Sequence, residues 1–222
     1  MSKLEQLIEE LCPDGVEYRE LNQICKNITT GKLNANSMVE NGIYPFYTCD
    51  ALPFRINEYA FDTEAILISG NGSRVGHINY YNGKFNAYQR TYVLSNFNDI
   101  EVNFLLHYLK EYLRDYILIY SKKGSIPYIT LPMLQNFKIP LPPLPVQREI
   151  VRILDNFTEL TAELTAELED RKKQYEYYRD SLLSFGDEVE WKTLGEISKI
   201  SRGIRVVKKE LSINGKYAVY QN

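Results

Sequence analysis

The chain has 222 residues, of which 44% are hydrophobic and 25% are charged, and its formal net charge at pH 7 is −3. This composition suits one well-buried core with an appendage, and the slight excess of acidic residues excludes nucleic-acid binding through bulk charge alone. Three cysteines without CxxC spacing and only two histidines argue against a metal cluster, and the sequence lacks the roughly 18 consecutive apolar residues of a membrane span. We therefore expect a cytoplasmic protein with reduced thiols, no metal and no membrane contact.

The amino-terminal part of the sequence predicts a short helix followed by strands. Residues 2–11 have apolar side chains at helical spacing, and the CPDG sequence at 12–15 ends this pattern. EAILISG (64–70) is typical of a buried strand, whereas HINYYNGKFNAYQRTYVL (77–94) predicts two strands joined by a turn at Asn82 and Gly83. We therefore expect a sheet between residue 16 and about residue 98.

A second helix is predicted after these strands, and a proline-rich segment follows it. The sequence VNFLLHYLKEYLRDYILIY (102–120) has helical periodicity, with Asn98 or Asp99 as its expected N-cap and the basic SKKG sequence at its end. KIPLPPLP (138–145) contains too many prolines for a helix and predicts a stiff, extended joint between domains. The expected apolar and aromatic face of the helix consists of Leu105, Tyr108, Leu109, Tyr112, Leu113 and Tyr116.

The residues beyond the prolines predict one long coiled-coil helix. No glycine or proline occurs between Val146 and Phe185, and nine of eleven heptad a and d positions are apolar or aromatic, the others being Thr161 and Arg171. Burial of each large apolar side chain contributes about 1.5–3 kcal/mol, so this pattern requires a partner helix. Apart from Phe185, the last d position, the predicted dimerisation residues are Ile150, Leu154, Phe157, Leu164, Leu168, Tyr175, Tyr178 and Leu182.

The last part of the chain repeats its beginning. VEWKTLGEISKI (189–200) matches VEYRELNQICKN (16–27) at an offset of 173 residues, and NGKYAVY (214–220) matches NGIYPFY (41–47) at the same offset. Two matches in one register indicate an internal repeat. We therefore predict that the chain begins a second domain of the same type, which stops after its first strand or two and is weakly ordered.

The glycine-rich sequence GNGSRVG (70–76) is the first candidate site. A nucleotide-binding loop of this form requires a helix after it, whereas HINYY predicts a strand, so a tight turn with structural glycines is favoured over a nucleotide site. The remaining alternative is a loop that faces DNA. In that case Arg74 contacts a phosphate or a guanine edge, and the small polar side chains of Asn71 and Ser73 form hydrogen bonds with base edges.

Other polar residues are also candidates for DNA contact. Gln89 and Arg90 are of the types that pair with adenine and guanine, although a polar strand face is the simpler explanation. The basic SKKGS sequence (121–125) and Lys32 suit phosphate contact, but the former also compensates a helix dipole. The predicted DNA-contacting residues are Lys32, Asn71, Ser73, Arg74, Gln89, Arg90, Lys122, Lys123 and Ser125.

Signatures of catalysis are lacking in the sequence. There is no adenine-methylation motif of the NPPY type, no G-K-[ST] nucleotide motif and no nucleophile with an adjacent base. His77 and His107 both lie among apolar residues, as structural histidines do. We therefore expect no catalytic residue and no metal ligand, and an enzyme with its own nuclease or methylase activity is the less favoured hypothesis.

Three stretches of the sequence resemble the DNA-specificity subunits of Type I restriction–modification systems. LIEELCPDGVEYREL (7–21) is similar to the opening of that family, and residues 66–94 are similar to the centre of its recognition domain. Residues 124–160 resemble the end of that domain and the start of the spacer helix, with IPLPPLPVQREIVRILD (139–155) as the most specific part. The resemblance covers essentially the whole chain.

The resemblance implies DNA recognition without chemistry. In this family each recognition domain reads one half of a bipartite site in double-stranded DNA, and two antiparallel spacer helices hold the domains apart. The subunit scaffolds methyltransferase subunits, which use S-adenosylmethionine, and through them a restriction subunit that uses ATP and Mg²⁺. This chain is thus expected not to be an enzyme and to hold no cofactor of its own.

The sequence departs from the family pattern in its number of domains. A full-length member has two recognition domains and two spacer helices, whereas this sequence has one of each and the start of another domain. We expect two copies to form a homodimer through their spacer helices and to replace a full-length subunit. The alternative is a truncated or phase-varied protein that acts only as a coiled-coil interaction partner.

The expected fold class is α+β. A mixed α/β target-recognition domain is followed by a long coiled-coil spacer helix and an incomplete second repeat. The expected parts are an N-terminal helix at 1–15, the recognition domain at 16–143, the spacer helix at 144–186 and the start of a second recognition domain at 187–222.

Overall fold

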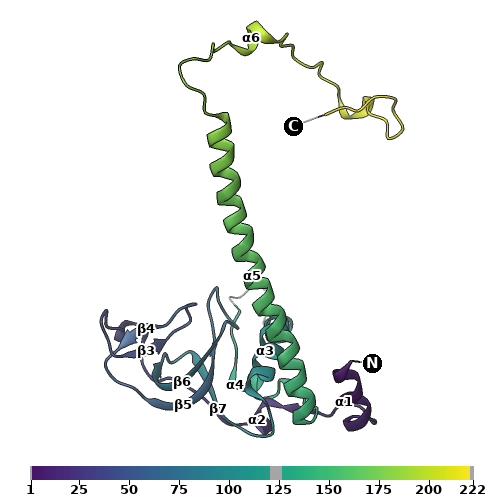
Figure 1. Cartoon of the computed structure of the whole chain (residues 1–222). Coiled ribbons are helices and arrows are strands. Elements are labelled where there is room, and N and C mark those ends of the chain that lie inside the picture. Colours follow the sequence, from purple (N-terminus) through teal and green to yellow (C-terminus); the bar gives the residue numbers. More distant parts are fainter. Residues whose placement is uncertain (1, 121–126, 221–222) are drawn as a thin grey trace. The chain divides into compact units, whose positions relative to one another are not determined.

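The computed structural model describes residues 2–120 and 127–220 of the chain (Figure 1). The chain divides into two compact units, Met1–Glu163 and Leu164–Asn222. The division falls within α5 (Leu144–Leu183), a single helix of 40 residues. No helix in the described part of the chain is long and apolar enough to cross a membrane.

The first unit is built around a six-stranded mixed sheet. Its strand order is β2-β7-β5-β6-β3-β4, and neighbouring strands are antiparallel except for β3 and β6, which are parallel. The predicted buried strand is confirmed, because residues 65–69 of β5 are all buried at the centre of this sheet. The six strands are β2 (Cys25–Thr30), β3 (Tyr44–Tyr47), β4 (Phe54–Ile56), β5 (Phe61–Ser69), β6 (Ile78–Ala87) and β7 (Thr91–Phe97).

Apolar side chains form a separate cluster on each face of the sheet. On one face, α3 (Val102–Tyr120) contributes Leu105, Leu109 and Leu113 to a cluster that includes Ile66 and Leu94 from the sheet. The other cluster contains Leu67, Phe85 and Val93. Alternate residues of β5 therefore enter opposite clusters, as the two-residue period of a strand requires.

The sequence from 77 to 94 does form two strands, but the predicted turn position is wrong. β6 continues through Asn82 and Gly83, which pair with Glu64 and Thr63 of β5. The chain instead turns after Ala87, where the Thr91 backbone N–H donates to the Tyr88 carbonyl at 2.9 Å. Gly83 has a φ of +133°, a backbone angle that glycine can adopt within a strand. Pairing along the whole of β5 outweighs the preference of Asn82 and Gly83 for a turn.

The predicted N-cap of α3 is also wrong. The helix begins at Val102, so Asn98 and Asp99 lie too far upstream to cap it. The Glu101 backbone N–H, at this end of the helix, donates to Gln147 Oε1 at 2.8 Å, an acceptor 46 residues away. A distant side chain therefore satisfies a donor that the sequence assigns to a local cap. The predicted helix face holds for its leucines, whereas Tyr112 is exposed.

Short elements connect the two ends of the first unit. β1 pairs antiparallel with β8, which brings residues 18–20 against residues 138–140. Leu21 and Ile24, directly after β1, are fully buried in the same cluster as α3. These elements are α1 (Lys3–Leu11), β1 (Tyr18–Glu20), α2 (Leu21–Ile24), η1 (Ala35–Ser37), α4 (Leu131–Gln135) and β8 (Lys138–Pro140).

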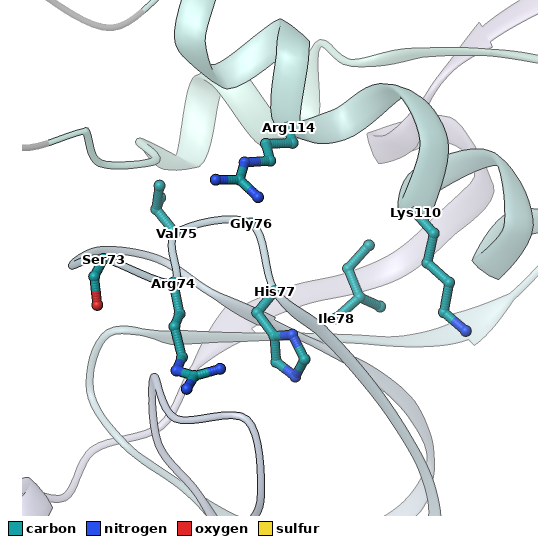
Figure 2. A pocket seen from close by; sticks show the side chains of 8 residues that line it. All are labelled: Ser73, Arg74, Val75, Gly76, His77, Ile78, Lys110 and Arg114. Atoms are coloured by element: carbon teal, nitrogen blue, oxygen red, sulfur yellow. The ribbon is translucent and has the colours of Figure 1, made fainter. Parts of the chain in front are cut away.

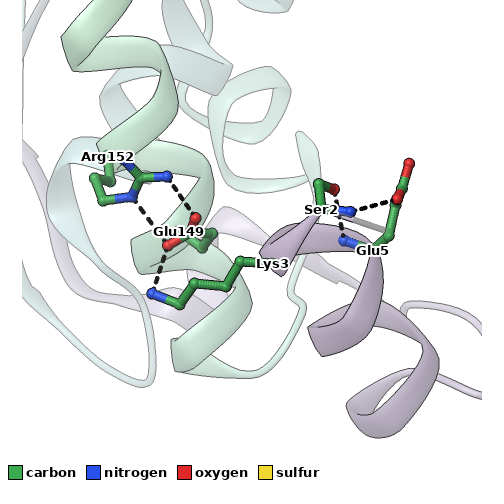
Figure 3. Close-up of polar contacts among 5 residues, drawn as sticks. All are labelled: Ser2, Lys3, Glu5, Glu149 and Arg152. Atoms are coloured by element: carbon green, nitrogen blue, oxygen red, sulfur yellow. Dashed lines mark hydrogen bonds and ion pairs between the residues drawn. The ribbon is translucent and has the colours of Figure 1, made fainter.

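The start of α5 is anchored to the first unit by buried polar side chains. Gln147 is fully buried and donates to the Pro142 carbonyl at 2.7 Å and to the Asp99 carbonyl at 3.3 Å. Glu149 is almost fully buried and accepts from Arg152 and from Lys3 of α1, at 2.7 and 2.9 Å (Figure 3). The first turns of α5 are therefore held on the domain by specific hydrogen bonds as well as by apolar contact.

The predicted long helix is confirmed, and it begins at Leu144, as expected for the spacer helix. Leu144 and Pro145 also end the proline-rich segment that was expected to be extended, and they are helical because proline in the first turn needs no hydrogen-bond donor. The helix ends at Leu183, so Phe185 is not a helical d position. Ile150 is half-buried against the domain core. The other predicted dimerisation residues are exposed in the single chain: Leu154, Phe157, Leu164, Leu168, Tyr175, Tyr178 and Leu182.

The end of the chain reproduces elements of its beginning. α6 (Leu194–Ile197) and η2 (Lys208–Glu210) each lie 173 residues after α2 and η1, respectively. No strand is formed within residues 187–220, although the repeat predicted one or two. The equivalents of β1 and β3 lie at 191–193 and 217–220, and in the first copy these strands pair with β8, β4 and β6.

Candidate nucleic-acid interface

The structure brings Asn71, Gln89 and Arg90 together around one small cavity. This cavity, called here the Asn71 cavity, has a volume of about 260 Å³. Asn71 follows β5, whereas Gln89 and Arg90 lie in the turn between β6 and β7. The other residues that line it are Thr30, Gly70, Tyr92, Tyr128 and Ile129.

Close backbone contact fixes the two loops of the Asn71 cavity relative to each other. The Gly70 N–H donates to the Arg90 carbonyl at 2.8 Å, and the Ile129 N–H donates to the Gly70 carbonyl at 2.8 Å. A Cβ atom at position 70 would lie 2.4 Å from the Arg90 oxygen, so only glycine permits this approach. The Cys49 thiol donates to Asn71 Oδ1 at 3.2 Å. The polar side chains therefore project from a braced framework, as base readout requires.

Lys32 lies in a third segment beside these loops. Its neighbour Leu33 forms a parallel bridge with Tyr88, and the Gln89 N–H donates to the Leu33 carbonyl at 2.9 Å. The Lys32 side chain is exposed. The backbone thus joins Lys32 to the turn that carries Gln89 and Arg90.

Ser73 and Arg74 line a second and larger cavity, called here the Arg74 cavity. Its volume is about 670 Å³, and it lies between the 70–76 loop and α3 (Figure 2). Lys110 and Arg114 of α3 complete it, with Arg114 reaching towards the loop and Arg74 extending on the other side of the loop. Three cations are therefore spread over this surface, an arrangement that suits an extended polyanion better than a single small anion.

Lys110 and Arg114 were not predicted from the sequence. They are one helical turn apart on the exposed side of α3, where basic residues usually form a solvated face. They line the Arg74 cavity only because the 70–76 loop packs against α3. Gly76 shows how close this packing is, because a Cβ atom there would lie 3.0 Å from Ile117 Cδ1. In the sequence, the only sign of this cation pair is the four-residue spacing of a lysine and an arginine. That spacing does not show which loop packs beside them.

The electrostatics of the two cavities favour an anionic ligand that accepts hydrogen bonds. Neither lining includes an aspartate or a glutamate. Burial raises the pKa of Tyr92, and its hydroxyl donates to the Ile129 carbonyl at 3.0 Å, which holds the edge of the Asn71 cavity in place. Within residues 2–120 and 127–220, no group of three or more His, Cys, Asp and Glu side chains could hold a metal ion. The surface therefore presents hydrogen-bond donors and cations, which suit base edges and phosphates.

Lys122, Lys123 and Ser125 lie outside the described residues. Of the predicted DNA-contacting residues, the structure therefore places Lys32, Asn71, Ser73, Arg74, Gln89 and Arg90. It brings all of them except Lys32 to two cavities, which are joined through the 70–76 loop, and Lys32 lies next to Leu33, which bridges to Tyr88. Their contact with DNA stays a prediction.

Comparison with known proteins identifies similar chains in restriction systems. Residues 13–171 match the family described as Type I restriction modification DNA specificity domain. The EcoDI specificity subunit of Escherichia coli is 37% identical over 166 residues, which cover 75% of this chain and 36% of that protein. The EcoR124I/EcoR124II specificity subunit of Escherichia coli is 61% identical over 87 residues, or 39% of this chain and 20% of that protein.

Solved structures show the same fold. A chain from a structure of complex assembly and conformational transition of the type I R-M system has a TM-score of 0.61 and 25% identity. The match covers 81% of this chain and 49% of that chain. The S subunit from M. genitalium has a TM-score of 0.58 and 24% identity, and the match covers 77% of this chain and 47% of that chain.

The matched region is less than half the length of each of these four relatives. From the family match over residues 13–171, we conclude that the chain belongs to the Type I restriction modification DNA specificity domain family.

Proposed function

We propose that this protein recognises a specific sequence in double-stranded DNA as the specificity subunit of a Type I restriction–modification complex. The recognition domain of the first unit reads one half of a bipartite site. The observation that carries this proposal is the gathering of Asn71, Gln89 and Arg90 at one cavity, on loops braced by Gly70. Amide and guanidinium groups discriminate adenine and guanine edges in the major groove.

The Arg74 cavity supports the same proposal with a different kind of contact. Arg74, Lys110 and Arg114 carry positive charge and line one surface with no carboxylate. Cations of this kind contact phosphates, which position a protein on DNA without reading its sequence. In this proposal the Asn71 cavity contacts bases, and the Arg74 cavity contacts phosphates.

In this proposal the subunit performs no chemistry. Methyltransferase subunits bring S-adenosylmethionine, and the restriction subunit brings ATP and Mg²⁺, so this chain needs no cofactor. The site of action is the cytoplasm, where the DNA and the partner subunits are present. Support comes from membership in the specificity family and from cavity linings that combine cations with neutral donors.

A second copy of the chain completes the two-domain arrangement. The exposed residues of α5, such as Leu164 and Leu168, form the apolar stripe that pairs with the same stripe of the other copy. The alternative is a protein that keeps this pairing but no longer recognises DNA, and so acts only as a coiled-coil interaction partner. DNA binding separates these two functions.

The proposal is tested by selecting DNA duplexes from a random pool with the full chain, alone and with its methyltransferase subunit. We expect one enriched motif at least in the presence of the methyltransferase. The Arg90→Gln variant should lose preference at one base pair, by about 1–3 kcal/mol of discrimination. Arg55→Gln, which removes the same charge outside both cavities, should keep the motif. Binding without sequence preference in every combination would refute the proposal.

A further inference from the structure

The strongest local concentration of positive charge in the chain lies outside the two cavities. Residues 199–209, called here the basic segment, contain five cations and no acidic residue, and they are Lys199, Arg202, Arg205, Lys208 and Lys209. The net charge of the whole chain is −3 and this segment contributes +5, so the other 211 residues together carry −8. Charge is therefore strongly separated along the sequence.

We propose that the basic segment is a second DNA-binding element, which contacts the phosphate backbone of the duplex. This inference rests on the proposed function and adds a sequence-independent contact to it. A polyanion carrying one negative charge per roughly 1.7 Å of its axis is the ligand that best matches closely spaced cations on an otherwise acidic chain.

The spacing of the cations suits a long polyanion. Lys199, Arg202, Arg205 and Lys208 recur at every third residue. No helix or strand lies between Ser198 and Val207, and both of these residues have extended backbone angles. In an extended chain that rises about 3.1–3.3 Å per residue, successive cations lie roughly 9–10 Å apart. The segment therefore presents a row of charges rather than a single cluster.

These side chains are available for an external ligand. All five are exposed. None takes part in the ion pairs found among the described residues of the chain. Because no close ion pair among the described residues offsets their mutual repulsion, association with an anion is favourable, and screening by salt weakens it.

The internal repeat supplies an independent reason to assign DNA as the ligand. At the offset of 173 residues, Lys199 corresponds to Lys26 and Arg205 to Lys32, which lies beside Gln89 at the candidate interface. The flanking helices α6 and η2 correspond to α2 and η1 in the same register. The basic segment therefore repeats a stretch that borders the proposed DNA site, and it adds cations at three further positions: 202, 208 and 209.

The test is the salt dependence of DNA binding by the full chain. The variant carries K199Q, R202Q, R205Q, K208Q and K209Q; all five positions are exposed, so the change does not disturb a core. Each phosphate contact contributes about 0.9 to the slope of log K against log salt, so loss of five contacts should reduce the magnitude of the slope by about 4 to 5 for each bound copy of the chain. The selected motif should not change, because phosphate contacts carry no sequence information.

A charge-preserving control accompanies this variant. Exchange of the two cation types, as K199R, R202K, R205K, K208R and K209R, should retain the wild-type slope. If the glutamine variant recognises the same motif with an unchanged slope, the basic segment does not contact DNA. The proposed function would then still stand. Wild-type protein that binds no DNA, alone or with methyltransferase, would overturn both. Preferential binding of the wild type to phosphatidylserine vesicles over duplex DNA, lost in the glutamine variant, would assign the segment to lipid instead.

Discussion

At the scale of single residues, a buried carboxylate connects the two helices that frame the first unit. Glu149 accepts hydrogen bonds from Arg152 on its own helix and from Lys3 of α1 (Figure 3). Donation by Arg152 and then by Lys3 lowers the pKa of Glu149 to about 2. A buried carboxylate with two cationic donors is stable only while it is ionised, which links this contact to pH.

We predict that Glu149 makes the stability of the protein depend on pH between about 4.5 and 2. Its folded-state pKa lies below its ordinary value, so the stabilisation is complete above about pH 4.5 and is lost as the pH falls towards 2. Thermal unfolding should give a lower midpoint for Glu149→Gln than for the wild type at neutral pH, with the two midpoints converging near pH 2. Glu159→Gln, on an exposed part of the same helix, should change the neutral midpoint less. A constant difference between the wild type and Glu149→Gln from pH 7 to pH 2 would contradict this role.

At the scale of elements, α5 exposes a row of large apolar side chains that nothing in the single chain covers within the described residues. Leu164 and Leu168 are 57% and 54% exposed in the single chain, and Phe157 is 64% exposed. Large apolar side chains repeated at heptad spacing are stable in water when a second helix covers them. The contribution of each to pairing is about 1.5–3 kcal/mol.

We predict that Leu164→Glu with Leu168→Glu abolishes the homodimer. The homodimer loses four leucines, two from each chain, which should weaken association by at least about 10,000-fold, and the four added carboxylates in the seam weaken it further. Light scattering at micromolar concentration should show a dimer for the wild type and a monomer for this variant. Ala162→Glu with Ala166→Glu adds the same charge at heptad positions b and f, away from the seam, and should remain dimeric. A wild-type protein that is a stable monomer would exclude the dimer.

At the scale of the whole molecule, a symmetric pair of chains predicts a symmetric DNA site. Two-fold symmetric proteins present the same reading surface twice, in opposite directions. A helix of 40 residues is about 60 Å long, and one turn of B-DNA is about 34 Å, so half-sites one to two turns apart match this spacer. We therefore expect the length of the spacer helix, rather than base contacts, to set the gap between the half-sites.

We predict that methylation directed by this protein follows a gapped inverted repeat. Long-read sequencing of DNA from cells that contain the chain and its methyltransferase should show one such motif. The motif should disappear in cells that carry the Leu164→Glu and Leu168→Glu variant, because one recognition domain then lacks its symmetric partner. An asymmetric bipartite motif would contradict the homodimer but not DNA recognition itself.

Local and periodic signals along the chain were enough to establish several features of this protein. The buried strand β5, the helix α3, the long helix α5 and the internal repeat all depend on the spacing of residues near one another in sequence. The chemistry of Asn71, Gln89 and Arg90 also marked them as candidates, since amide and guanidinium groups are suited to base edges.

Contacts between distant residues established the rest. β6 runs straight through Asn82 and Gly83 because it pairs with β5, and the Glu101 N–H, just before α3, donates to Gln147 rather than to a local cap. Lys110 and Arg114 join the candidate interface only because the loop with Arg74 packs against α3. In each case, ladder pairing or burial between remote segments contributes more free energy than the local preference for a turn, a cap or a solvated face.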